Sequence, residues 1–115
     1  MNFEVCRIKE GKIVIAHSNN NMSVGYLEIN PNSELKKHNR PCTECLYQIK
    51  GVATMVLFDE KDSTKELILK EGEEIEIPLG KYHIHANRTS EPCVQMWKAK
   101  GDIREILDEI RKNSL

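Results

Sequence analysis

The sequence has no long apolar run. No stretch approaches the roughly 18 consecutive apolar residues that a transmembrane helix needs. The first dozen residues, MNFEVCRIKEGK, carry charges where a secretory signal peptide has its apolar core. We therefore expect no membrane partner and a cytoplasmic location.

The sequence also lacks an excess of either charge. It has 17 basic and 18 acidic residues, for a formal net charge of −1. Its densest basic cluster, Lys36, Lys37 and Arg40, is short. A nucleic-acid-binding face needs many basic groups to neutralise phosphates, so nucleic acid is not expected as a partner.

The sequence lacks the cysteine pattern of a zinc knuckle. Its four cysteines are Cys6, Cys42, Cys45 and Cys93. In a reducing cytosol we interpret them as thiols. Cys42 and Cys45 form a CxxC, but no second pair completes a structural zinc site. Cys6 and Cys93 are interpreted as small core residues.

The 115 residues fit one domain, without repeats or linkers. Short apolar or alternating runs, separated by turn residues every 8–12 positions, predict an antiparallel sandwich or barrel over residues 1–100. The predicted strands are Phe3–Arg7, Lys12–His17, Met22–Ile29, Glu44–Lys50, Val52–Phe58, Glu66–Leu69, Glu74–Ile77, His83–Asn87 and Cys93–Lys98.

The last segment, residues 101–115, has a helical period. Apolar residues fall at i, i+3, i+4 and i+7, which predicts an amphipathic helix over residues 102–112. Gly101 and Asp102 are the predicted N-cap, with Glu105 in the capping-box position. We expect this helix to pack on the barrel. Dimerisation through its apolar face is the alternative.

One informative stretch runs from Asn32 to Gly51. His38, Arg40, Cys42 and Glu44 would share one face of an unbroken strand, although Pro41 favours a kink or loop there. An imidazole and a carboxylate suit a divalent metal, so His38 and Glu44 are candidate ligands.

A second stretch runs from Gly72 to Asn87. Pro78 and Gly80 predict a tight turn, after which His83, His85 and Asn87 alternate onto one face. Inward-facing histidines need hydrogen bonds or a metal, because an unpaired buried imidazole is unfavourable.

Together these stretches resemble the two cupin motifs. The second stretch fits G-x5-P-x-G-x2-H-x3-N at Gly72, Pro78, Gly80, His83 and Asn87. The first fits G-x5-H-x-H-x3-E-x6-G at His38, Glu44 and Gly51, with Asn32 replacing the leading glycine and Arg40 replacing the second histidine.

The resemblance implies an all-β fold, a double-stranded β-helix or jelly-roll barrel, with the predicted C-terminal helix added. Metal-binding cupins hold a divalent ion with three histidines and a glutamate. Carried over by position, the resemblance implies that His38, Glu44 and His83 are metal ligands. It leaves Fe, Mn, Zn and Ni open.

Arg40 is the departure from the motif. A guanidinium cannot ligate a metal, and at about 6 Å from a dication it adds roughly 5 kcal/mol of repulsion at an effective dielectric near 20. Three outcomes are open. Arg40 swings away and leaves a two-histidine, one-carboxylate triad, or it clamps an anionic substrate, or it abolishes metal binding.

Other residues are expected to modify the site. Arg40, Gln48 and His85 are candidate substrate-binding residues, Gln48 because it shares strand parity with Glu44. His85 lies one layer deeper and hydrogen-bonds the ligands, or is a core histidine satisfied elsewhere. Cys42 is a possible additional ligand or redox group, or it simply packs.

These observations favour a metal-dependent cupin acting on a small polar or anionic molecule by dioxygenase- or isomerase-like chemistry. The alternatives are a non-catalytic domain that binds or senses a small ligand, and a metal-free isomerase- or epimerase-like cupin with a histidine as general base. We expect a homodimer, since a small barrel often buries further apolar surface against a copy of itself.

Overall fold

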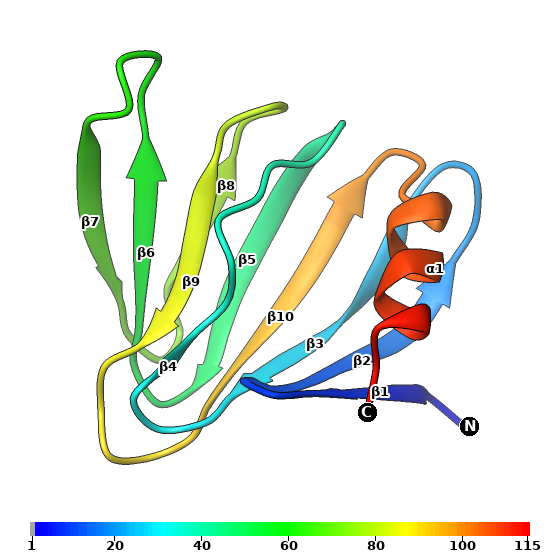
Figure 1. Cartoon of the computed structure of the whole chain (residues 1–115), viewed down its shortest axis with the longest axis horizontal. Coiled ribbons are helices and arrows are strands. Elements are labelled where there is room, and N and C mark those ends of the chain that lie inside the picture. Colours follow the sequence, from blue (N-terminus) through cyan, green and yellow to red (C-terminus); the bar gives the residue numbers. More distant parts are fainter. Residues whose placement is uncertain (1) are drawn as a thin grey trace.

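Ten strands and one helix follow one another within residues 2–115, the part of the chain that the computed structural model describes (Figure 1). The elements are β1 (Glu4–Ile8), β2 (Gly11–Ser18), β3 (Ser23–Ile29), β4 (Ser33–Glu34), β5 (Thr43–Lys50), β6 (Ala53–Phe58), β7 (Thr64–Leu69), β8 (Glu74–Ile77), β9 (His83–Asn87), β10 (Cys93–Lys100) and α1 (Arg104–Lys112).

The strands form two antiparallel sheets that face each other (Figure 1). One has six strands in the order β1-β2-β3-β10-β5-β8, and the other has four in the order β4-β9-β6-β7. Neighbours such as β3, β10 and β5 are far apart in sequence, as in a jelly roll. The predicted all-β jelly-roll barrel with a C-terminal helix is confirmed.

Every predicted strand is present, with its ends within two residues of the prediction. The alternating burial that predicted them is visible in β10, where Cys93, Gln95, Trp97 and Ala99 point inward. Strand β4 was not predicted, because two residues are too few to show a period.

Two tight backbone positions lie on either side of the site, one in the turn before β4 and one in the turn before β9. Asn32 adopts φ 54°, the left-handed conformation that asparagine tolerates better than most residues, in the place of the motif's leading glycine. Gly80, at φ 78°, donates its N–H to the carbonyl of Arg40 over 2.9 Å. This bond ties the loop that carries His38 and Arg40 to the turn before β9.

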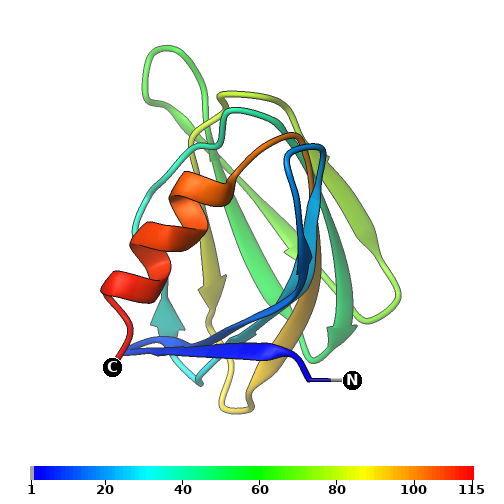
Figure 2. The same cartoon turned by 90° about the vertical axis from the view of Figure 1, so that its right-hand side faces the viewer.

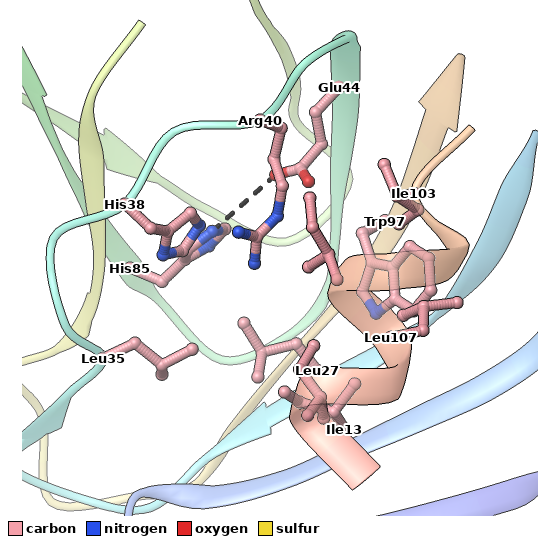
Figure 3. A pocket seen from close by; sticks show the side chains of 12 residues that line it. Ile13, Leu27, Leu35, His38, Arg40, Glu44, His85, Trp97, Ile103 and Leu107 are labelled. Atoms are coloured by element: carbon pink, nitrogen blue, oxygen red, sulfur yellow. Dashed lines mark ion pairs between the residues drawn. The ribbon is translucent and has the colours of Figure 1, made fainter. Parts of the chain in front are cut away.

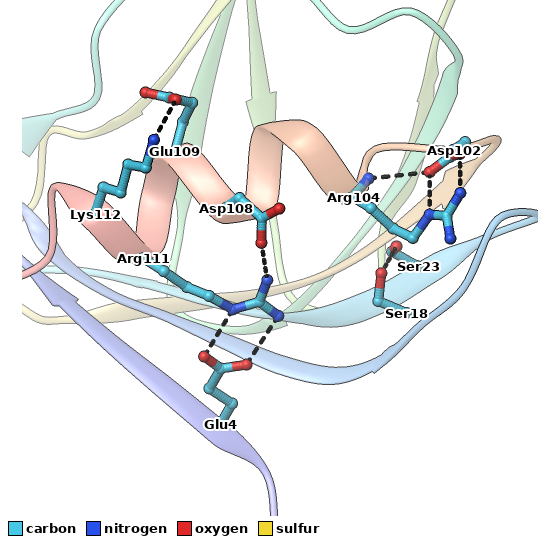
Figure 4. A network of polar contacts seen from close by, with 9 residues as sticks. All are labelled: Glu4, Ser18, Ser23, Asp102, Arg104, Asp108, Glu109, Arg111 and Lys112. Carbon is cyan, nitrogen blue, oxygen red and sulfur yellow. Dashed lines mark hydrogen bonds and ion pairs between the residues drawn. The ribbon is translucent and has the colours of Figure 1, made fainter.

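Helix α1 begins later than predicted. Ile103 occupies the N-cap position without a side-chain capping bond, so the predicted capping box of Asp102 and Glu105 is wrong. The carboxylate of Asp102 instead accepts bonds from the backbone and side chain of Arg104 (Figure 4). Ile103 is 3% exposed, so the N-cap residue is held in the core.

The apolar face of α1 packs inside this chain. Leu107 is buried, and Ile106 and Ile110 pack against the core that Leu107 joins. The helix lies across one open side of the barrel (Figure 2). At its end, Arg111 forms two bonds of 2.8 and 3.0 Å to Glu4 on β1 (Figure 4).

Among residues 2–115, no helix is both long and apolar enough to cross a membrane.

Candidate metal centre

Three histidines converge between the two sheets. His38 comes from the loop before β5, and His83 and His85 come from one face of β9, as strand alternation predicted. One ring nitrogen of each lies within 4.8 Å of the other two. The loop is held to β9 by reciprocal backbone bonds of 3.0 and 2.9 Å between His38 and His83.

Each of the three rings is oriented by a bond at Nδ1. The partners are carbonyl oxygens at 2.9–3.0 Å: Lys36 O for His38, Lys81 O for His83 and the side-chain Oε1 of Gln95 for His85. A carbonyl oxygen only accepts, so each Nδ1 carries the hydrogen. The neutral ring then has its lone pair on Nε2, the atom that faces the cluster.

The surroundings keep two of these rings neutral. Burial, reinforced by the neighbouring His85, Arg40 and His83, lowers the pKa of His38 to about 2. Burial also lowers the pKa of His85 to about 4, although Glu44 opposes the shift. Both imidazoles are therefore neutral near pH 7, the form that binds a metal.

Glu44 supplies a carboxylate to the same spot. It is buried on β5, and its Oε1 lies 3.7 Å from Nε2 of both His83 and His85. Burial raises the pKa of this carboxyl, but His83, His85 and Arg40 together outweigh burial and lower it to about 2. Glu44 is thus ionised near neutral pH.

The donor atoms fit a divalent metal. His38 Nε2, His83 Nε2 and Glu44 Oε1 are buried and have no hydrogen-bond partner within residues 2–115. Unpaired buried polar atoms are unfavourable, and one ion coordinated by all of them would satisfy the set. Imidazole nitrogens with one carboxylate suit first-row divalent ions such as Mn, Fe, Ni and Zn.

Arg40 lines the cavity beside this cluster instead of swinging away from it (Figure 3). Within residues 2–115, its guanidinium forms one hydrogen bond, to the carbonyl of Asn39 at 3.3 Å. No carboxylate of residues 2–115 lies within 4.0 Å of its guanidinium nitrogens. Burial lowers the Arg40 pKa, against the opposing effects of Glu44 and Cys42, yet arginine stays protonated.

The structure brings together four of the predicted site residues: His38, Glu44, His83 and His85. We expected His85 one layer deeper or as a core histidine satisfied elsewhere, but it is a full member of the histidine cluster. Two sequence signals pointed to this place: its shared face with His83, and the missing second histidine at position 40.

Gln48 faces inward, as its parity predicted, but the structure does not bring it to the cavity. It is fully buried, and its Nε2 donates to the carbonyls of Lys50 and Gly51 over 3.0 and 3.3 Å. The side chain thereby holds the turn between β5 and β6.

Cysteine is absent from the histidine cluster in the described chain, residues 2–115. Cys42 is buried against Gly101, and a Cβ added to that glycine would lie 2.8 Å from the Cβ of Cys42. Burial raises the pKa of the Cys42 thiol. Cys45 is partly exposed and lies 4.0 Å from Glu76 Oε2. The two thiols of the CxxC thus have different surroundings.

A cavity of about 430 Å³, its open mouth included, lies next to the cluster. One side presents His38, Arg40, Glu44 and His85. The other side is apolar, with side chains from β2, β3, β10 and α1 (Figure 3). Leu27, Trp97 and Ile106 are among these apolar side chains.

A model of the cupin domain family matches residues 25–97, the segment that carries the whole cluster. Comparison with curated protein sequences finds no match.

Among solved structures, oxalate decarboxylase from Bacillus subtilis superposes with a TM-score of 0.77 at 25% identity, over 86% of this chain and 28% of that one. That enzyme has Mn(II) centres. Oxalate decarboxylase from Lactobacillus farciminis, in complex with formate, gives a TM-score of 0.78 at 22% identity, over 88% of this chain and 32% of that one, and shows likeness of fold alone. The chain spans less than a third of the length of these enzymes.

Proposed function

This chain belongs to the cupin domain family, and we propose that it binds one divalent metal ion through His38, His83, His85 and Glu44 and acts on a small anionic molecule. One observation carries the proposal. Three imidazole nitrogens with their lone pairs turned inward meet one ionised carboxylate, and within residues 2–115 the donor atoms of His38, His83 and Glu44 have no hydrogen-bond partner.

His85 is the residue that makes a four-ligand set possible. The first cupin motif here has Arg40 where a histidine is usual, which leaves His38, Glu44 and His83. His85, on β9, adds a third imidazole to the set, and its Nε2 lies 3.7 Å from Oε1 of Glu44. The proposed set keeps the three ligands predicted from the sequence and adds this fourth.

A bound divalent ion would supply Lewis acidity and open coordination positions at this spot. The chain's own groups do the rest. Arg40 attracts and orients an anion beside the centre, and the apolar wall limits water around it. The Mn(II) centres of B. subtilis oxalate decarboxylase support manganese as one candidate beside Fe, Ni and Zn.

Metal content tests the proposal directly. Protein purified without added metal, then equilibrated with Mn(II) and desalted, should hold about one ion per chain by plasma mass spectrometry. His83→Ala and His85→Ala should each lose that ion, whereas His17→Ala, which removes an exposed histidine, should retain it. Circular dichroism should show that all three variants are folded.

Full metal content in both His83→Ala and His85→Ala would overturn the assignment. Retention in His85→Ala alone would return the ligand set to His38, Glu44 and His83. Turnover on a panel of small acids then tests the enzymatic part, because stoichiometric metal without any turnover would favour a binding or sensing domain.

A further inference from the structure

The cavity has two chemically different sides, and this contrast restricts what it can bind. The polar side joins the proposed metal centre, and the opposite side is formed by apolar side chains from the large sheet and from α1 (Figure 3). A ligand that fills the space must therefore have one charged or polar end and one apolar end.

Arg40 defines the polar end. Its guanidinium points into the cavity, lies within 4.0 Å of no carboxylate in residues 2–115, and forms one hydrogen bond, to Asn39. Most of its five N–H donors are therefore free for a ligand. The planar guanidinium matches a carboxylate in a bidentate arrangement, with both partners charged.

The opposite side defines the remainder of the ligand. Leu27 and Trp97 come from the inner face of the large sheet, and Ile106 comes from the face of α1 turned toward it. A second charged group placed against these side chains would lose its hydration without gaining a partner. An aliphatic or aromatic body would instead be buried favourably.

We infer that the ligand of this cavity is a small monocarboxylate with an apolar body, its carboxylate at Arg40 and its body against Leu27, Trp97 and Ile106. This deepens the proposed function by naming the substrate class at the same site. It also distinguishes this site from one suited to oxalate. Oxalate consists of two carboxylates and has no apolar part to contact the apolar wall. The enclosed part of the cavity is small, about 40 Å³ for the centre of a water-sized molecule, and this limits the acid to a small one.

Trp97 is the single tryptophan of the chain and lies in the cavity wall, so its fluorescence reports on binding without any turnover. Three probes of similar size separate the two ends of the ligand: isovalerate has a carboxylate and an apolar body, succinate replaces the body's end by a second carboxylate, and isoamyl alcohol lacks the charge. We expect isovalerate to bind at least about tenfold more tightly than either of the others.

Two variants test which residues cause the preference for isovalerate. Arg40→Gln should remove about tenfold or more of the preference for isovalerate over isoamyl alcohol, and Ile106→Asn should reduce the preference for isovalerate over succinate. Arg88→Gln is the matched control, because Arg88 pairs with Glu66 on the exposed surface, and it should change neither preference.

The titrations are run on metal-free and on Mn(II)-loaded protein, with metal content measured separately. Succinate binding as tightly as isovalerate, or an acid preference that survives Arg40→Gln, would overturn this inference while leaving the metal centre intact. If the histidine variants kept their metal while the probe preferences stayed as expected, the proposed metal centre would be overturned and the monocarboxylate inference would stand.

Discussion

His85 Nδ1 lies 3.0 Å from Oε1 of Gln95, and both side chains are buried. Gln95 Oε1 accepts the hydrogen, so the bond fixes the tautomer of His85 and turns its Nε2 toward Glu44. The Nε2 of Gln95 lies 3.5 Å from Met55 Sδ, which helps to define which way the amide points. A residue on β10 thus orients a proposed metal ligand on β9.

Gln95→Leu should therefore weaken metal binding without removing a ligand. The side chain keeps its approximate size, but His85 is free to rotate and to move its hydrogen to Nε2. Loss of such an orienting bond typically lowers metal affinity about 10–100-fold. Competition for Mn(II) against a coloured chelator measures the change.

Gln48→Leu is the matched control for Gln95→Leu. It also removes a fully buried glutamine amide, but one that bonds to Lys50 and Gly51 and does not line the cavity. We expect a less stable protein with unchanged metal affinity. Equal effects of the two substitutions on metal affinity would show that Gln95 acts through general stability and not through His85.

Arg40 should couple metal binding to anion binding. A guanidinium at about 6 Å from a dication adds roughly 5 kcal/mol of repulsion at an effective dielectric near 20, which Glu44 and a bound anion offset. Isovalerate should therefore raise the Mn(II) affinity of the native protein, and Mn(II) should raise the isovalerate affinity by the same factor. Isothermal titration calorimetry measures both.

Arg40→Gln tests that coupling. Without the anion, the variant should bind Mn(II) at least about tenfold more tightly than the native protein, because the repulsion is gone. Adding isovalerate should then change its metal affinity much less. If this substitution left the Mn(II) affinity unchanged in the absence of anion, Arg40 would exert no electrostatic effect on the metal centre.

The sequence predicted the strands and the faces of their side chains, because alternation is a local property. Parity correctly turned Glu44, Gln48, His83 and His85 inward. How far along the barrel axis a side chain lies is not a local property of the sequence. Gln48 lies four residues along β5 from Glu44, roughly 13 Å at strand spacing, which takes it away from the cavity.

The place of His85 depends likewise on how the sheets meet. Its partner Gln95 comes from β10, in the other sheet, and the register that aligns them is set by packing across the core. Motif spacing could place His83 by resemblance, but His85 is outside the motif, and only its shared face with His83 and the missing histidine at position 40 pointed to it. Strand β4 was missed because two residues show no period, and the late start of α1 because Ile103, at its N-cap, is buried in the core.

The cysteines should differ in reactivity. Cys45 is partly exposed, whereas Cys6, Cys42 and Cys93 are buried, and burial raises the pKa of each of these three thiols. In native protein at neutral pH, a thiol-specific disulfide reagent should modify one thiol rapidly and the other three only after unfolding. Cys45→Ser should abolish the fast phase and leave Mn(II) binding unchanged. A second fast thiol at Cys42 would show that it is open to the reagent despite its burial.

Anchoring of α1 should depend on its apolar face more than on its ion pairs. Leu107 is 1% exposed within the core, whereas Glu4 and Arg111 are both partly exposed to solvent. We expect Leu107→Ala to lower the free energy of unfolding by about 2–5 kcal/mol, since it removes buried methyl groups and leaves a cavity.

Glu4→Gln is the comparison, because it removes the charge that pairs with Arg111 while keeping the side chain's shape. Exposed ion pairs contribute little, so its effect should stay below about 1 kcal/mol. Urea unfolding of metal-free protein, followed by circular dichroism, measures both changes. A larger loss from Glu4→Gln than from Leu107→Ala would mean that the bond to β1, and not the buried leucine, holds the helix over the cavity.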